Sequence, residues 1–138
     1  MYEIKITKLS ETSVHVTDDG KVKRVMSNPE EWTNRFNPIL IFRDFLKMLD
    51  CGLSEYLECM TEQLFKREGI FKYESPLKVD DIINDTLNRK HIAKDGKTIS
   101  KKNNGQYSFH IESVNPRTLQ DWIVTDFEIA VKEVVDNA

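Results

Sequence analysis

The chain has 138 residues, 39% of them hydrophobic and 31% charged, and a formal net charge of −3 at pH 7. This length is typical of one domain with a hydrophobic core of its own, so we expect residues 1–138 to form a single folded domain. The mild acidity argues against a domain that binds nucleic acid with its whole surface, since such domains are usually basic. It leaves room for a local basic patch.

The N-terminal segment and the two cysteines indicate the cellular compartment. Residues 1–9 alternate between polar and apolar and lack the apolar core of a secretory signal. The longest apolar run, residues 39–42, is far too short to span a bilayer. If both were helical, Cys51 and Cys59 would lie about 12 Å apart, beyond the reach of a disulfide. We therefore expect reduced thiols, no membrane partner and a location in the cytoplasm, of the protein's own cell or of a host.

Residues 2–26 predict an antiparallel β meander of three strands. Apolar and polar residues alternate from Tyr2 to Ile6 and again from Val14 to Val16, which is the period of a half-buried strand. The pair Asp19-Gly20 then separates this segment from residues Val22–Met26, and a DG pair flanked by β-branched residues is typical of a hairpin turn.

Three helices are predicted next, at residues 38–50, 54–67 and 76–90. Asn37-Pro38 supplies a capping residue and a proline at the first helical position, and Gly52 is suited to the left-handed residue that ends the first helix. Apolar residues cover most of the first helix, which places it in the middle of the core.

Residues 91–113 return to strand patterns, with turn signals at Asp95-Gly96 and at Asn103–Gly105, and either a second small meander or one longer hairpin fits them. A long helix of about six turns is predicted for residues 116–135, because its apolar residues recur every three or four positions. Together the elements define an α+β fold: an N-terminal antiparallel β meander, central helices, a second β-hairpin and a long C-terminal helix.

The chain carries no recognisable motif for catalysis, cofactor binding or metal binding. Nucleophile elbows and phosphate-binding glycine loops are absent, and His15, His91 and His110 lack the short ligand spacing of zinc sites. Asp81 and Asp85 could hold a divalent cation on one helix face, but acidic residues early in a helix also complement its dipole, and we favour that role. We therefore predict no catalytic, cofactor or metal residues, while an enzyme site without a known motif stays open.

One segment, residues 89–102, is locally basic and contains a single acid, Asp95. On a flexible hairpin its cations would suit phosphate contacts, which need positive charge more than fixed geometry. A solvated, lysine-rich loop explains the same composition and is the more common case. The cations are Arg89, Lys90, Lys94, Lys97, Lys101 and Lys102.

Three helices followed by a basic hairpin are also the element order of a winged helix-turn-helix protein. Three features oppose that alternative. The third helix carries acidic residues where it would face the DNA groove, the connector 68–75 is long for such a turn, and the whole chain is acidic.

The distribution of charge favours a protein-binding function. Acidic residues of the C-terminal helix would face away from the basic segment, and such a dipolar surface steers the encounter of two proteins. Trp32 lies in a segment without periodicity and is a candidate partner anchor, whereas Trp122 is assigned to the core. The acidic residues are Asp121, Glu128, Glu133 and Asp136.

The sequence thus predicts a small non-enzymatic protein-binding module, a regulator or inhibitor that acts by contact with a protein partner. The alternative is a nucleic-acid-binding domain that uses the hairpin 89–102. A homodimer is a further option, since the apolar stripe of the helix 116–135 is wide enough to pack against a second copy. The size, charge and lack of motifs also suit an accessory protein of a phage or mobile element, although no residue pattern carries that assignment.

Overall fold

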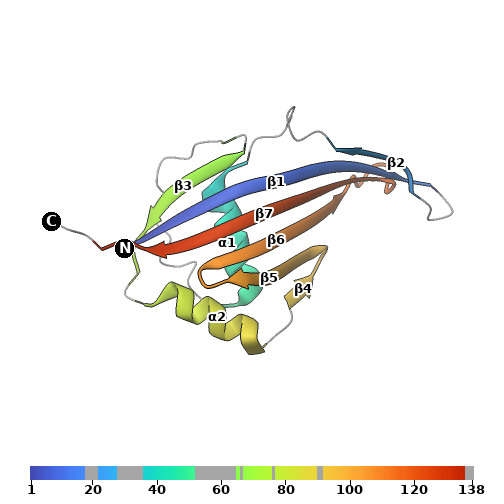
Figure 1. Ribbon diagram of the computed structural model, residues 1–138. Coiled ribbons are helices and arrows are strands. Elements are labelled where there is room, and N and C mark those ends of the chain that lie inside the picture. The colour runs from blue at the N-terminus through green and yellow to red at the C-terminus, as the bar shows by residue number, and fades with distance from the viewer. Residues whose placement is uncertain are drawn as a thin grey trace.

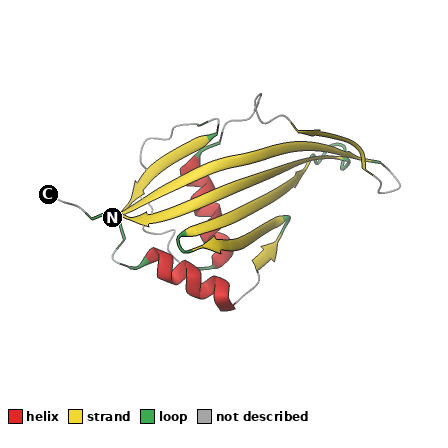
Figure 2. Cartoon of the chain, in the orientation of Figure 1, coloured by secondary structure: helices red, strands yellow, loops and turns green. Residues whose placement is uncertain are grey.

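A single antiparallel sheet of seven strands, with two short helices beside it, organises the part of the chain that the structure describes (Figures 1 and 2). The computed structural model describes residues 1–17, 22–27, 36–51, 65, 67–75, 77–89 and 92–135, with the backbone alone for 22–27 and 89. The strands are β1 (Tyr2–Val16), β2 (Val22–Ser27), β3 (Glu68–Tyr73), β4 (Ile92–Lys94), β5 (Lys97–Asn103), β6 (Gln106–Val114) and β7 (Asp121–Glu133). The helices are α1 (Pro38–Leu49) and α2 (Val79–Arg89).

The first and last strands, β1 and β7, lie side by side in the middle of the sheet. The strand order is β2-β1-β7-β6-β5-β4, and β3 also pairs with β1. Because β3 runs along residues 2–7 of β1 and β2 along residues 12–16, these two strands share one edge of the sheet. The β1–β7 ladder reaches from Tyr2, opposite Glu133, to His15, opposite Asp121.

The two faces of the sheet differ in what covers them. Alternate residues of each strand point to one face, here called the inner face, and those of the central strands are buried, as Tyr2, Ile4 and Ile6 of β1 are. Helix α1 lies across this face, and α2 packs at its border with the buried residues Val79 and Ile83 (Figure 1). The opposite face, here called the open face, has neither of these helices on it.

Aromatic rings join α1 to the sheet. Phe42 contacts Phe71 of β3 with ring centroids 5.5 Å apart, and Phe45 contacts Phe109 of β6 at 5.7 Å, both edge to face. Such pairs stabilise a core by about 0.5–1.5 kcal/mol beyond the area that they bury. The helix is therefore fixed to both halves of the sheet.

Local sequence signals explain where α1 begins and ends. The side chain of Asn37 accepts a hydrogen bond from the N–H of Ile39 at 3.0 Å, and Pro38 opens the helix. Asp50, with a φ of 54°, takes the left-handed conformation at the other end. Gly52, predicted for that role, lies outside the described residues.

Strand β1 corrects the predicted three-stranded meander. Residues 2–16 form one strand, with a bulge at Leu9 where the pairing with β7 shifts between Lys8 and Ser10. The bulge moves the side-chain alternation by one residue, so the polar residues that follow stay within the strand. Strand β2 pairs back along β1 to make a two-stranded hairpin, whose turn lies outside the described residues.

The predicted long C-terminal helix is wrong. Residues 121–133 form β7, which pairs with β1 on one side and with β6 on the other. Phe127, Ile129 and Val131 are buried and alternate with more exposed residues. The apolar residues of this segment fit a period of two as well as a helical period, and its β-branched residues favour the strand. Long-range pairing with β1 decides between the two periods.

The helix predicted for residues 54–67 lies mostly outside the described residues. Its described end, Phe65, forms a β-bridge with Phe36, and residues 68–73 form β3 in place of the expected connector. The alternation of buried and exposed residues along β3 fits this pairing with β1.

Of the two arrangements predicted for residues 91–113, the structure has the small meander, formed by β4, β5 and β6 with turns at the expected Asp95-Gly96 and Asn104-Gly105. The winged-helix arrangement does not form, because α2 packs on the main sheet and the basic hairpin is part of that same sheet. The α+β layout predicted from the sequence is therefore wrong: one antiparallel sheet carries two short helices, and its last element is a strand.

A pair of substitutions tests the assignment of β7. Ile129 is fully buried, so Ile129→Ala should lower the free energy of unfolding by about 2–5 kcal/mol in urea denaturation. Ala130 lies on the open face, so Ala130→Thr should change it by less than about 0.5 kcal/mol. A long helix would bury Ala130 and make Ala130→Thr costly, and that result would refute the strand.

Candidate functional site

A chain of four polar side chains crosses the open face of the sheet. Ser10 of β1 donates a hydrogen bond to Asp126 of β7 at 3.1 Å, and Nδ1 of His110 lies 2.6 Å from the other carboxylate oxygen of Asp126. Nε2 of His110 lies 2.9 Å from a carboxylate oxygen of Glu112. The register of β6 and β7 places His110 directly opposite Asp126, which explains why these side chains meet.

The two carboxylates change the ionisation of the histidine. The hydrogen bond to Glu112 is the main cause that raises the pKa of His110 above its ordinary value, and Asp126 adds to it, while partial burial opposes the rise. The protonated ring donates from both nitrogens, one to each carboxylate. In that protonated form neither nitrogen keeps a free lone pair, so both nitrogens are engaged with the carboxylates and neither is open to a metal ion. The imidazole serves as an electrostatic link within β6 and between β6 and β7.

An apolar cluster adjoins this polar chain on the open face. Trp122 of β7 is directly paired with Val14 of β1 on one side and with Val114 of β6 on the other. Val124, two residues along β7, is paired with Glu112 of the polar chain. Paired residues of neighbouring strands lie on one face, so Trp122, Val14, Val114 and Val124 form one cluster, here called the Trp122 patch.

The Trp122 patch overturns one prediction. Trp122 was expected in the core, but the core lies on the inner face and Trp122 is only half-buried on the other. The three valines of the patch are half-buried as well. The error follows from the helix predicted for this segment, whose wide apolar stripe would have included Trp122.

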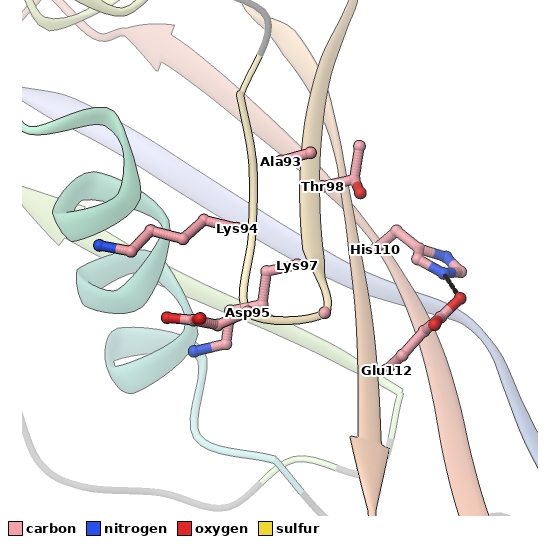
Figure 3. A pocket seen from close by; sticks show the side chains of 8 residues that line it. Ala93, Lys94, Asp95, Lys97, Thr98, His110 and Glu112 are labelled. Atoms are coloured by element: carbon pink, nitrogen blue, oxygen red, sulfur yellow. Dashed lines mark hydrogen bonds and ion pairs between the residues drawn. The ribbon is translucent and has the colours of Figure 1, made fainter.

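The β4–β5 turn borders a shallow pocket of about 320 Å³. Figure 3 shows Thr98, His110 and Glu112 on one side of this hairpin and Lys94 and Lys97 on the other. The lining residues therefore belong to both faces of the sheet. A pocket divided in this way by the backbone offers no enclosed chamber for a small ligand.

The structure separates the predicted basic residues instead of gathering them. Lys94 and Lys97 flank the β4–β5 turn, whereas Lys101 and Lys102 lie at the far end of β5. With about 3.3 Å per residue, the two pairs are more than 10 Å apart. Arg89 ends α2 with only its backbone described. Lys90 and the candidate anchor Trp32 lie outside the described residues.

Two of these lysines are held by carboxylates. Lys97 forms an ion pair with Asp44 of α1 at 2.9 Å, and Lys102 forms one with Glu128 of β7 at 3.1 Å. Lys97 therefore leans toward the helix side of the sheet and Lys102 toward the open face. The four described lysines, Lys94, Lys97, Lys101 and Lys102, therefore do not form one surface.

The predicted acidic face of a C-terminal helix is also divided. Asp121 pairs with His15 at 2.7 Å, a bond that lowers the pKa of the Asp121 carboxyl, and Glu133 pairs with Lys78 at 3.2 Å. Glu128 holds Lys102 on the open face, and Asp136 lies outside the described residues. A dipolar surface built on a helix is thus not what this strand provides.

A second shallow pocket, of about 500 Å³, lies between the end of α1 and α2. Asp50, Asp81 and Asp85 line it, whereas Asp80 accepts a hydrogen bond from the hydroxyl of Tyr107. Burial, with help from Asp80, raises the pKa of Tyr107 and keeps its proton in place. Within the described ranges, no group of three or more His, Cys, Asp and Glu side chains is arranged to hold a metal ion.

Sequence reasoning missed the polar chain on the open face. His110 and Glu112 stand two residues apart in a predicted strand, which places them on one face, so part of the signal was present. Asp126 was assigned to a helix, and Ser10 had no predicted neighbour. Only the order β1-β7-β6 brings the four residues together.

Comparisons with protein-family models, curated proteins and solved structures gave no match for this chain. Neither described helix is long and apolar enough to cross a membrane. The candidate functional surfaces are therefore the open face, with its Trp122 patch and polar chain, and the edges of the sheet.

A pH series tests the electrostatic link at His110. A raised pKa in the folded state means that the link stabilises the protein fully below the unfolded pKa of about 6.5, and that this contribution is lost as the pH rises through the folded pKa. The difference in free energy of unfolding between the wild type and His110→Gln should therefore be largest near pH 6 and should become smaller toward pH 9. Urea denaturation at each pH measures the gap.

Glu112→Gln supplies the control, because the Glu112 carboxylate is the main cause of the raised pKa of His110. In a Glu112→Gln background, the effect of His110→Gln on the free energy of unfolding should be nearly independent of pH. A gap between wild type and His110→Gln that stays constant across the series would contradict the link.

Proposed function

We propose that this protein is a small non-enzymatic protein-binding module and that a partner docks on its open face at the Trp122 patch. The observation that carries the proposal is the position of Trp122, outside the core and between Val14 and Val114 on neighbouring strands. The partner that fits best is a protein segment with apolar side chains next to basic ones.

The apolar half of this fit comes from the patch itself. Tryptophan buries a large area with few rotatable bonds, which is why it is frequent where binding energy is concentrated. The paired valines widen the patch across three strands, on a rigid sheet that needs no rearrangement to receive a partner. An aliphatic or aromatic side chain of the partner would cover them.

The basic half of the fit comes from the polar chain beside the patch. Asp126 and Glu112 bring two carboxylates next to Val124, and the single imidazole between them, His110, can balance at most one of the two charges. A lysine or arginine of the partner would meet the remaining negative charge. Such complementarity speeds association and selects against acidic partners more than it adds affinity.

A role as a regulator or inhibitor is consistent with this kind of surface. A non-enzymatic module of this kind would act by occupying a surface of its partner. We extend the proposal to that role and leave the partner defined by its chemistry alone.

Truncation of Trp122 tests the docking surface. Selection of binders from a displayed random-peptide library should enrich apolar sequences flanked by Lys or Arg. A selected peptide, titrated by fluorescence anisotropy, should bind Trp122→Ala at least tenfold more weakly, a loss of about 1.4 kcal/mol or more. Ile123→Ala is the matched control, because Ile123 is 39% exposed but points to the other face.

Two results would count against the docking surface. One is a set of enriched peptides without basic residues. The other is a peptide that binds Trp122→Ala and the wild type equally well, since its contacts would then lie elsewhere.

Nucleic acid binding through the hairpin 89–102 stays the alternative proposal. The exposed side chains of Lys94 and Lys101 support it, since neither forms an ion pair with a residue that the structure describes. Replacing Lys94, Lys97, Lys101 and Lys102 together by Ala should weaken binding to labelled DNA or RNA and flatten its dependence on salt. The slope should fall by about one unit for each phosphate that the protein no longer neutralises.

The control for this quadruple variant changes Lys5, Lys47, Lys72 and Lys132 to Ala, which removes the same charge elsewhere. Anisotropy at several salt concentrations measures the slopes. No binding at low salt, or an equal slope for both quadruple variants, would reject the hairpin as a nucleic-acid site.

A further inference from the structure

Strand β3 has an edge to which no other described strand is bonded. It pairs with β1 along one side only, and it borders the sheet in Figure 1. A strand edge of this kind carries backbone donors and acceptors that can receive another strand. Association through this edge goes beyond the proposed function and does not depend on the Trp122 patch.

The hydrogen-bond pattern shows which residues of β3 present their backbone outward. The N–H of Lys8 bonds to the carbonyl of Arg67 at 2.6 Å, so this pair is a hydrogen-bonded pair of the β1–β3 ladder. Hydrogen-bonded and non-bonded pairs alternate along an antiparallel ladder. Gly69 and Phe71 therefore bond to β1, and the N–H and C=O groups of the residues between and beside them point outward. These outward residues are Glu68, Ile70 and Lys72.

The same three residues expose their side chains on the open face, while Gly69, Phe71 and Tyr73 are buried. Ile70 is 50% exposed, so its side chain is available to a second strand at this edge. It lies midway between an acid, Glu68, and a base, Lys72. An acid and a base spaced evenly about a central apolar residue are self-complementary in an antiparallel pair.

We propose that two copies of this chain associate through antiparallel pairing of β3 with β3. Ile70 lies opposite Ile70 of the second copy, on the two-fold axis. Glu68 lies opposite Lys72 of the second copy, and Lys72 opposite Glu68. Each of these three pairs uses outward backbone groups on both sides, so each exchanges two hydrogen bonds, and the two sheets become one continuous sheet.

The charges also select this register over the neighbouring one. A shift by two residues would place Ile70 opposite Lys72 and Glu68 opposite Glu74, which combines an unpaired cation with two like charges. Glu68 also lies 3.5 Å from Lys5 of β1, a half-exposed ion pair that adds little stability and leaves the carboxylate free to meet a second cation.

Charged residues on an edge strand usually prevent pairing, but here the in-register arrangement is the one that satisfies them. The contact is small, so the dimer is expected to be weak and to depend on concentration.

Charge reversal at the two ends of the strand tests the pairing. Sedimentation velocity over the micromolar to millimolar range should show a reversible monomer–dimer equilibrium for the wild type. Glu68→Lys and Lys72→Glu should each weaken dimerisation at least tenfold, because like charges then face each other across the axis. The double variant E68K/K72E should recover dimerisation, and an equimolar mixture of the two single variants should form heterodimers.

Lys132→Glu is the matched control, since it makes the same substitution on the open face of β7, away from the edge. Ile70→Pro gives a second test, because it removes an outward N–H and leaves the bonds between β3 and β1 in place. It should abolish the dimer while circular dichroism and the melting temperature show a folded monomer. Hydrogen exchange should be fast at the outward amides of the dilute monomer and slower in the dimer.

Three outcomes would overturn the proposal. The first is a wild type that stays monomeric at millimolar concentration. The second is a dimer whose stability is the same in Glu68→Lys, Lys72→Glu and Lys132→Glu. The third is strong protection of the Glu68, Ile70 and Lys72 amides in the dilute monomer, which would mean that another part of the same chain covers the edge.

Discussion

The packing of α1 on one face of the sheet is the interaction on which the rest of the structure depends. Phe42 and Phe45 fix the helix to β3 and β6, and the apolar residues of the central strands have a dry surface to join only on that side. The opposite face carries the polar chain and the Trp122 patch, and its residues remain closer to water than those of the core. The polar chain Ser10–Asp126–His110–Glu112 has a small desolvation cost on this face, because it stays near water. An aromatic residue such as Trp122 on the same face suggests a binding surface.

The sequence predicts those elements whose signals are local. Asn37-Pro38 marks the start of α1, and Asp95-Gly96 marks a hairpin turn, because a cap and a turn are decided by a few adjacent residues. Segment 121–133 has no such marker, and its apolar residues fit two periods at once. The strand partner that resolves this ambiguity lies at the other end of the chain. The candidate site has the same origin, since its residues become neighbours only through the strand order.

The two surfaces proposed for binding lie at opposite ends of the sheet. Strand β3 pairs with residues 2–7 of β1, whereas the Trp122 patch includes Val14, about 25 Å further along the strand. Dimerisation through β3 would therefore leave both patches accessible. A dimer of this kind would bind a two-site partner through both patches, which raises the apparent affinity without any new contact.

The central position of β1 and β7 has a consequence for folding during synthesis on the ribosome. Tyr2 is paired with Glu133, so β1 leaves the ribosome well before its partner β7, and the middle of the sheet can close only after β7 has been made. At 5–20 residues per second, synthesis of residues 17–120, which separate the two strands, takes roughly 5 to 20 s. During this time β1 emerges without its central neighbour. The polar residues between Lys8 and Ser13 then protect the nascent chain, because they make the waiting strand a poor template for aggregation.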